Sequence, residues 1–311
     1  MRFISKTFAG GHKMSQSKNI TRTVKLILGV VLFLSGLTSV EASVWRTRRA
    51  IATADPDNRW TNGEIFYQLS PTLQGNLSAL KQAMADWERH TCIRFLPASP
   101  NTRDKLLITE GNGVVCASYL GSKVGEQELV LGRQCREDKV ASLHELGHAI
   151  GLLHENQRPD KDQFVEIIFK NAIGAHLASL IKLNESVIDE TLKIPYDYRS
   201  IMHLSGYAFA KGAAMTIRTL DPTFQDVIGQ RKSLSFRDIK TVNLMYRCAA
   251  KHCPQVRLDC TAYHAEAFIG SDCRCACPGE DMMSVKPCIP ETQPTQKSST
   301  TNHSGGERGK L

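Results

Sequence analysis

The chain has 311 residues, of which 41% are hydrophobic, so it is long and apolar enough for one ordinary core with a small appendage, and a wholly disordered or fibrous chain is excluded. Its 39 Lys and Arg against 31 Asp and Glu give a formal net charge of +8. Residues 1–49 carry nine basic side chains and one acidic one, which accounts for the whole excess, while residues 50–311 carry 30 of each sign. The charge therefore gives no argument for a nucleic-acid partner, and we expect none.

An apolar run without charged residues spans residues 26–40, follows three basic residues and precedes small residues near Ala42. This order is typical of a secretory signal peptide, to which we assign residues 1–42. Met14 is better placed as the start than Met1, because it shortens the basic leader. A spanning helix needs roughly 20 apolar residues, so a stable membrane anchor is the less favoured alternative. The sequence predicts a secreted, extracellular protein.

The basic tetrapeptide RTRR ends at Arg49. Processing proteases of the secretory pathway cut after such clusters, which would leave residues 43–49 as a short propeptide and Ala50 as the mature N-terminus. The alternative is a solvated run of charge. Since ten cysteines occur in a chain expected to be secreted, disulfides are the default expectation.

The first periodic elements follow the processing site. Residues 64–69 predict a strand after the Asn62-Gly63 turn. Apolar residues at helical spacing then predict an amphipathic helix over residues 75–91, and these residues are Leu77, Leu80, Met84 and Trp87. Residues 92–95, 105–108 and 128–131 predict further strands.

The later elements begin with a helical pattern between Asp138 and Gly151. A long irregular stretch covers residues 155–234, after which Ser235 and Asp238 indicate the N-cap of an apolar-rich helix. Because the strands and helices precede the irregular stretch rather than alternate along the chain, the order predicts an α+β fold.

The run His144-Glu145-Leu146-Gly147-His148 carries the chemistry. Its two histidines are four residues apart on a predicted helix, so their imidazoles point the same way, as two ligands of one metal ion must. Glu145 is placed to take a proton from a metal-bound water. Gly151 can adopt a positive φ and end the helix, which would turn His154 back as a third ligand.

Three histidines leave a fourth coordination position for water, which is typical of catalytic rather than structural zinc. The pattern therefore predicts one catalytic Zn²⁺ per chain. The alternative is two surface histidines and one buried structural histidine. That alternative is weaker because the complete run from His144 to His154 is far rarer than a bare H-E-x-x-H motif.

Further motifs occur in the order found in the astacin family of secreted metzincin zinc endopeptidases, which residues 50–248 resemble. They are residues 91–95, the 111–121 segment with Cys116, residues 132–135, the extension 155–160, residues 196–198, Ser200-Ile201-Met202-His203 and residues 243–248. The resemblance implies an α+β metzincin fold of two subdomains. In it a twisted mixed sheet and long helices lie above the cleft, and an irregular subdomain lies below.

The resemblance also implies roles for single residues. His144, His148 and His154 would bind zinc, Glu145 would be the general base, and Met202 would form the base of the metal site. The implied disulfides are Cys92–Cys248 and Cys116–Cys135, although four cysteines alone allow three connectivities. In the family, the glutamate that corresponds to Glu155 pairs with the new N-terminal amine, which Ala50 would supply here. Substrates would be extracellular proteins or peptides, lying extended along the strand near residues 128–131.

The match fails at one catalytic position. The family places a tyrosine after the Met-turn histidine, as a further zinc ligand that then stabilises the oxyanion, whereas this chain has Leu204. Losing one such donor typically costs about 10²–10³ in rate, a loss that could leave the site slow without abolishing its activity. Tyr207 could substitute only if the loop bends differently. A catalytically silent zinc-binding recognition protein is therefore the alternative function. A second departure is that residues 43–49 lack the aspartate of family propeptides.

Residues 249–288 contain six cysteines and resemble the EGF-like modules that often follow this catalytic domain. The six are Cys253, Cys260, Cys273, Cys275, Cys277 and Cys288. A zinc cluster is a poor alternative in an oxidising compartment. We expect a small disulfide-held module that binds an extracellular protein partner or adds only stability.

The remaining features concern the surface and the C-terminal end of the sequence. Residues 289–311 are rich in Ser, Thr, Pro and Gly and predict a flexible tail. Asn76, Asn184 and Asn302 lie in N-x-S sequons and are candidate glycosylation sites.

Overall fold

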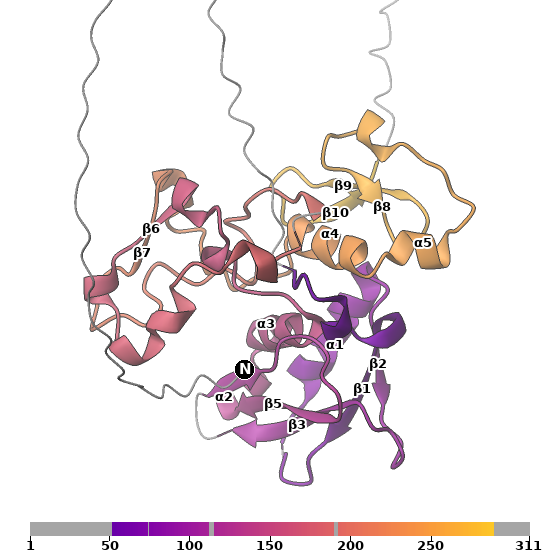
Figure 1. Cartoon of the computed structure of the whole chain (residues 1–311), viewed down its shortest axis with the longest axis horizontal. Coiled ribbons are helices and arrows are strands. Elements are labelled where there is room, and N and C mark those ends of the chain that lie inside the picture. Colours follow the sequence, from indigo (N-terminus) through magenta and orange to yellow (C-terminus); the bar gives the residue numbers. More distant parts are fainter. Residues whose placement is uncertain (1–51, 74, 112–114, 190–191, 289–311) are drawn as a thin grey trace, which may run out of the picture. The chain divides into compact units, whose positions relative to one another are not determined.

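The computed structural model describes residues 52–288 except residues 74, 112–114 and 190–191 (Figure 1). The expectations for the signal peptide, the propeptide, Arg49, Ala50, Asn302 and the C-terminal tail lie outside the described residues.

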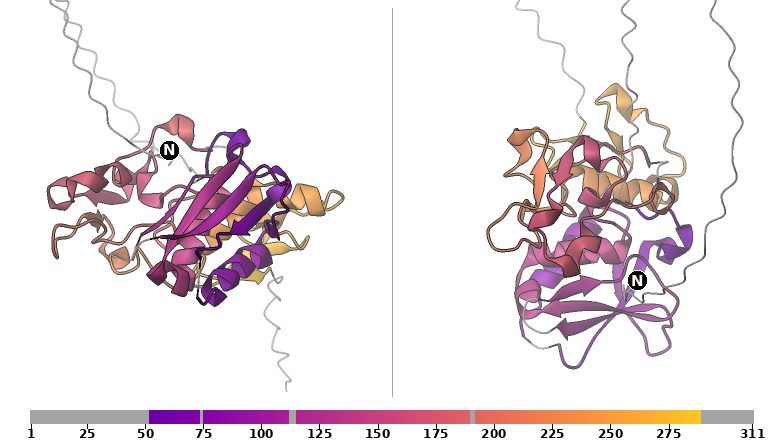
Figure 2. Two further views of the ribbon diagram at one scale, coloured as in Figure 1. Left: turned by 90° about the horizontal axis from the view of Figure 1, so that it is seen from below. Right: turned by 60° about the vertical axis from the view of Figure 1, so that its left-hand side comes forward.

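A five-stranded mixed sheet forms one layer, in the order β2-β1-β3-β5-β4. The strands are β1 (Glu64–Leu69), β2 (Arg94–Pro97), β3 (Lys105–Gly111), β4 (Cys116–Ser118) and β5 (Glu126–Gly132). All neighbouring pairs are parallel except β4 with β5, which are antiparallel. Figure 2 shows the strands of this sheet side by side, in purple and magenta. The strand predicted over residues 64–69 has the predicted bounds.

Two helices pack together beside this sheet, α1 (Ser78–His90) and α3 (Lys139–Ile150). Of the four predicted apolar positions of α1, Leu80, Met84 and Trp87 are buried. The indole Nε1 of Trp87 donates to the backbone oxygen of Leu143 on α3 at 3.2 Å. This contact connects α1 directly to the helix that carries the predicted metal ligands. The short helix α2 (Arg133–Glu137) precedes α3.

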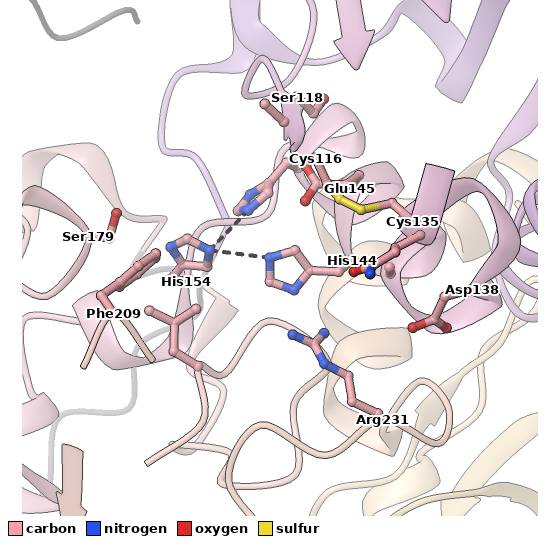
Figure 3. Close-up of a pocket in the computed structure, with 15 residues that line it drawn as sticks. Cys116, Ser118, Cys135, Asp138, His144, Glu145, His154, Ser179, Phe209 and Arg231 are labelled. Carbon is pink, nitrogen blue, oxygen red and sulfur yellow. Dashed lines mark hydrogen bonds between the residues drawn. A yellow bond between two sulfur atoms is a disulfide. The ribbon is translucent and has the colours of Figure 1, made fainter. Parts of the chain in front are cut away.

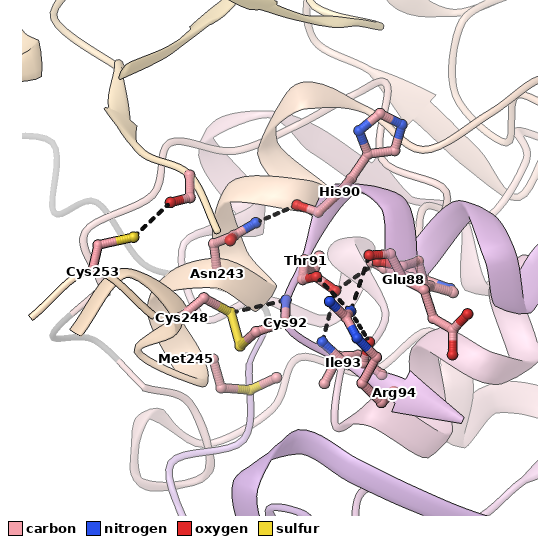
Figure 4. Close-up of a disulfide and its surroundings, with 12 residues drawn as sticks. Glu88, His90, Thr91, Cys92, Ile93, Arg94, Asn243, Met245, Cys248 and Cys253 are labelled. Atoms are coloured by element: carbon pink, nitrogen blue, oxygen red, sulfur yellow. Dashed lines mark hydrogen bonds between the residues drawn. A yellow bond between two sulfur atoms is a disulfide. The ribbon is translucent and has the colours of Figure 1, made fainter. Parts of the chain in front are cut away.

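Several predicted element ends differ from the observed ones. Strands β3 and β5 extend beyond the predicted residues 105–108 and 128–131, and two other differences have a local cause. Helix α1 begins three residues later than expected because the side chain of Asn76 accepts the backbone N–H of Ser78 at 2.8 Å and forms a turn there. The second strand begins at Arg94 rather than Cys92. Before it, Cys92 is held in a disulfide with Cys248, and the hydroxyl of Thr91 accepts the N–H of Ile93 at 3.2 Å (Figure 4).

One expectation about the sheet is wrong. Strand β5 contains the residues beside which an extended substrate was expected, but it pairs with β3 on one side and β4 on the other. Its backbone groups are therefore already used. The edge of the described sheet on this side is β4, because this short antiparallel strand covers β5.

Residues 155–234 are largely irregular, as predicted, and contain short 3₁₀ turns with one small sheet of β6 (Val165–Ile167) and β7 (Ile217–Thr219). They enclose a second hydrophobic cluster that includes Leu204. Helix α4 (Phe236–Met245) then begins at Ser235 with the expected cap: the Ser235 hydroxyl accepts the N–H of Asp238, whose carboxylate accepts the N–H of Ser235.

After α4 come α5 (Cys248–His252) and a three-stranded sheet of β8 (Phe268–Ile269), β9 (Cys275–Pro278) and β10 (Val285–Pro287). All ten cysteines are paired, and none is free. The pairs are Cys92–Cys248, Cys116–Cys135, Cys253–Cys273, Cys260–Cys275 and Cys277–Cys288. No helix in the described part of the chain is long and apolar enough to span a bilayer.

Candidate active site

Helix α3 begins and ends with the groups that its sequence predicts. The carboxylate of Asp138 accepts the N–H of Val140 at 2.8 Å and caps the first turn. At the other end Gly151 has φ of 119°, a conformation that side-chain-bearing residues rarely adopt. Its N–H donates to the carbonyls of Gly147 and His148, which closes the helix and redirects the chain toward His154.

The three predicted histidines come together. The Nε2 atom of His154 lies 3.2 Å from Nε2 of His144 and 3.1 Å from Nε2 of His148 (Figure 3). One ligand atom from each residue falls in a group within 4.8 Å of one another. The i, i+4 spacing places two of the rings on one helix face, and the turn at Gly151 supplies the third.

The other ring nitrogens have fixed partners. The Nδ1 atom of His144 is 2.8 Å from the carbonyl oxygen of Ile201, and that of His148 is 2.8 Å from the carbonyl oxygen of Leu152. Because a carbonyl only accepts, both Nδ1 atoms carry the proton and both Nε2 lone pairs face the centre. His154 Nδ1 lies 3.2 Å from the side-chain oxygen of Gln157, which fits the same tautomer.

Burial keeps these imidazoles neutral. It lowers the pKa of His144 to about 3 and that of His148 to about 4, and it lowers the pKa of His154 well below its usual value. Neutral imidazole is the form that binds a metal ion.

The donor set fits a zinc ion. Two nitrogens that are each 2.0–2.1 Å from a tetrahedral zinc lie about 3.3–3.4 Å apart, which is close to the two Nε2 separations in this structure. The carbonyl partners of His144 and His148 are the outer contacts that usually orient zinc-binding imidazoles. The rings of the three histidines are neutral, their Nε2 lone pairs converge and their tautomers are fixed, as binding of a zinc ion requires.

Glu145 lies in the cavity that the three histidines line, with a volume of about 580 Å³. It is 8% exposed, and burial raises its pKa to about 7, with the positive charge of Arg231 acting in the opposite direction. A carboxylate with a pKa near neutrality can both accept and return a proton at physiological pH. Glu145 thus has the environment that a general base requires.

Met202 is fully buried against α3, the helix that carries His144 and His148. A Cβ atom at Gly147 would lie 2.6 Å from the sulfur of Met202, so the glycine permits this close approach. The backbone N–H of Met202 donates to the Ser200 hydroxyl at 3.0 Å, and its carbonyl accepts the N–H of Glu155 at 3.2 Å. The turn around Met202 is therefore held internally by Ser200 and is hydrogen-bonded to the residue that follows His154.

Glu155 is 1% exposed and contacts groups of the described chain. Its carboxylate lies 3.1 Å from Arg158 Nη1 and accepts the N–H of Asp197 at 2.7 Å. Burial raises the pKa of Glu155 to about 8, while the charge of Arg158 opposes this shift. The expected amine of Ala50 lies outside the described residues, but Thr53 donates its N–H to Gly151 at 3.1 Å, so the chain near that end runs beside the end of α3.

The position of the family tyrosine is occupied by an apolar side chain that faces the site. Leu204 lines the same cavity as the three histidines and is 8% exposed. Tyr207 is 56% exposed and is not among the residues that line this cavity. The structure therefore does not bring Tyr207 to the place of the missing hydroxyl.

Sequence reasoning overlooked three side chains around the site. Arg231 lines the cavity and extends toward His144 (Figure 3), Gln157 contacts the ring of His154, and Asp238 holds the turn before Met202. Asp238 had a sequence signal in its place in the helix cap, and Gln157 had one in the 155–160 motif, although neither signal indicated a contact with the site. Arg231 lies within the long irregular stretch, so no periodicity indicated where its side chain would point.

The candidate glycosylation residues within the described chain are both exposed. The side-chain oxygens of Asn76 and Asn184 each accept a backbone N–H two residues on, from Ser78 and Ser186 respectively. Their nitrogens thus lie on surface turns.

Comparison with known proteins gives one consistent result. The family model described as Astacin, a peptidase family, matches residues 52–247. Blastula protease 10 of Paracentrotus lividus is 33% identical over 235 residues, covering 73% of this chain and 38% of that protein. The dorsal-ventral patterning protein tolloid of Drosophila melanogaster is 35% identical over 212 residues, covering 67% of this chain and 20% of that protein. The chain thus spans well under half the length of these curated relatives.

A solved structure agrees with the sequence comparisons. High choriolytic enzyme 1, a hatching enzyme zinc-protease from Oryzias latipes, aligns with a TM-score of 0.55 and 34% sequence identity, over 61% of this chain and 92% of that chain. The family model, the relatives and this fold all cover the region that carries the three histidines. The chain belongs to the astacin family of peptidases.

Proposed function

We propose that the chain is a secreted zinc-dependent metalloendopeptidase that hydrolyses peptide bonds of extracellular proteins. The observation that supports this most directly is the convergence of three neutral imidazole Nε2 atoms beside the buried carboxylate of Glu145 in one cavity. Membership of a peptidase family points to the same reaction.

A zinc ion bound by the three histidines would act as a Lewis acid on the scissile carbonyl and lower the pKa of an attacking water. Glu145 would take a proton from that water and pass it to the departing amine, a sequence suited to a carboxyl whose burial raises its pKa. Met202 would support the histidine helix from below, and Gly151 would set the direction of approach of His154.

The substrate would bind along β4 rather than β5. Cys116, Ala117 and Ser118 of this edge strand line the cavity. Among the described strands, β4 is the last of the sheet on this side, so an extended peptide would add there as a further strand. A peptide added there would lie next to the histidines.

Secretion and processing belong to the same proposal. Residues 1–42 would be removed as a signal peptide and residues 43–49 after Arg49, leaving a catalytic domain over 50–248, an EGF-like module over 249–288 and a tail over 289–311. The new amine at Ala50 would approach Glu155, a buried carboxyl group that already pairs with Arg158. Asn76, Asn184 and Asn302 would carry glycans, and the EGF-like module is where an extracellular partner would bind.

A catalytically silent zinc-binding recognition protein is the second candidate, and Leu204 favours it. Leu204 faces the site without a hydroxyl where the family has its tyrosine, and Tyr207 is exposed. The intact Glu145 favours the enzyme, because a carboxylate that binds no metal has no evident use in a silent protein.

One experiment separates the two functions. The full chain would be expressed for secretion, and its cleavage of casein and of a quenched peptide measured with and without a zinc chelator. We expect cleavage that the chelator removes and that falls to background in the Glu145→Ala variant. Cleavage equal in the two proteins would leave the silent zinc-binding protein as the function.

A further inference from the structure

The cysteine-rich segment packs against the catalytic region through α4. Phe268 and Ala276 of the segment belong to the main hydrophobic core, and the rings of Phe236 and Phe268 lie 5.6 Å apart. The N–H of Phe236, at the first turn of α4, donates to the carbonyl of Met282 at 2.8 Å. Figure 1 shows β8, β9 and β10 beside α4. The segment is thus in contact with the N-terminal turn of α4.

One side chain of that turn binds two separate parts of the chain. Arg237 donates from Nε and Nη2 to the two carboxylate oxygens of Glu266, in the cysteine-rich segment. Its third nitrogen, Nη1, donates to the backbone oxygen of Tyr196 at 2.8 Å. The planar guanidinium makes this arrangement rigid, because all three donors share one plane. The ion pair is mostly buried, with side-chain exposures of 20% and 14%.

Tyr196 begins the stretch that leads to the Met-turn. Its hydroxyl lies 2.8 Å from Nε2 of His203. The next residue, Asp197, donates its N–H to Glu155 at 2.7 Å and accepts the hydroxyl of Ser235, the cap of α4. Displacement of Tyr196 would therefore disturb contacts both before Met202 in the chain, at Asp197, and after it, at His203.

Asp238, which follows Arg237 in α4, connects this helix to one of the predicted zinc ligands. Asp238 accepts the hydroxyl of Ser200 at 2.6 Å and the N–H of Ile201 at 2.8 Å. The carbonyl of Ile201 in turn accepts Nδ1–H of His144 at 2.8 Å. Asp238 is 1% exposed and every one of these bonds is buried, so solvent cannot replace them.

We propose that Glu266 is a positioning residue for the metal site. Through Arg237 it fixes the first turn of α4 and the Tyr196 backbone, and these hold the turn that orients His144. The cysteine-rich segment is then part of the machinery that keeps the zinc ligands in place, in addition to any partner it binds. This inference rests on the proposed zinc site, but it does not require that the protein cleave anything.

The test compares zinc affinity in the full chain with and without the Glu266 carboxylate. Outer contacts that touch a zinc ligand usually contribute 10–100-fold to affinity. Since Glu266 acts through two intermediates, we expect Glu266→Ala to weaken zinc binding by about three- to tenfold. Affinity would be measured by competition with a chromogenic chelator, and the Co²⁺-substituted protein would show an altered visible spectrum.

The control is Glu126→Ala, which removes the carboxylate paired with Lys105. That ion pair joins β3 to β5, with side-chain exposures of 48% and 15%, and neither residue belongs to α4 or to the turn around Met202. We expect it to lower thermal stability slightly while leaving zinc affinity and the Co²⁺ spectrum unchanged. Glu266→Gln, which keeps the shape and one acceptor, should recover part of the affinity lost in Glu266→Ala.

Zinc affinity of Glu266→Ala within twofold of the unmodified protein, or equal losses in the two alanine variants, would overturn the inference. Cleavage assays on the same samples keep the two proposals apart. An unmodified protein that binds zinc and shows no Glu145-dependent cleavage would refute the peptidase function alone.

Discussion

Arg158 has one of the largest fully buried side chains in the described chain, and its removal gives a sharp test of the architecture below the site. Its guanidinium donates twice to Asp160, at 2.9 and 2.8 Å, and once to Glu155 at 3.1 Å. Two further donors reach the carbonyls of Ile194 and Pro195. The variant Arg158→Met keeps much of the volume and removes all five bonds.

The magnitude follows from what the variant leaves behind. Two carboxyl groups, on Glu155 and Asp160, stay buried at 1% and 7% exposure without their cation. Breaking a buried ion pair by removing one partner costs about 3–5 kcal/mol. The exposed pair of Arg133 and Glu137, at 77% and 51%, is the matched control, and Arg133→Met should cost less than about 1 kcal/mol.

The loss should also depend on pH. Burial already raises the pKa of Glu155 to about 8, and removing Arg158 raises it further, so the folded-state pKa lies above the unfolded one. The protonated form then stabilises the fold, and that contribution is lost as pH rises through the folded pKa. The deficit of Arg158→Met relative to the unmodified protein should therefore be larger at about pH 8.5 than at about pH 6.

Urea unfolding followed by tryptophan fluorescence measures all of these quantities, because Trp60 and Trp87 are buried. A deficit for Arg158→Met no larger than that of Arg133→Met would refute the reasoning. A deficit that grows as the pH falls would contradict the assignment of its cause to unpaired carboxylates.

Three further predictions concern the site. Leu204→Tyr should raise kcat at least about tenfold, since one oxyanion donor is worth about 10²–10³, and unchanged turnover would show that the leucine is compensated elsewhere. Protonated Glu145 cannot act as a base, so kcat/KM should decrease as the pH is lowered, with an apparent pKa between about 4.5 and 7. Removing the positive charge in Arg231→Gln should raise this apparent pKa, and an unchanged or lower value would contradict the influence of Arg231 on Glu145. Zinc at a thousandfold excess over its Kd should stabilise the fold by about 4 kcal/mol in thermal unfolding, and His148→Ala should lose this response.

The metal site was predictable because its signals are local. The spacing of His144 and His148 follows from helix geometry, and a glycine before His154 follows from the φ that a sharp turn requires. The cap at Ser235 is equally local. In each case residues within one or two helical turns determine the outcome, so a single sequence contains the necessary information.

The features that sequence reasoning missed depend on contacts between distant segments. Whether β5 offers a free edge depends on where β4 pairs, and the apolar pattern of residues 128–131 is the same in either case. The direction of Arg231 and the pairing of Arg237 with Glu266 are set by tertiary packing. The strand at Arg94 was misplaced by two residues, because the N–H of Ile93 bonds to the hydroxyl of Thr91 before the strand begins.

The bond between Cys92 and Cys248 spans 156 positions of sequence, and every candidate zinc ligand lies between its ends. A single cut anywhere in that interval would leave two fragments joined covalently. Preparations clipped by their own activity would therefore migrate as full-sized protein on a non-reducing gel and separate only after reduction. Purity judged without a reducing agent would overstate the fraction of intact chains, and turnover numbers based on it would be too low.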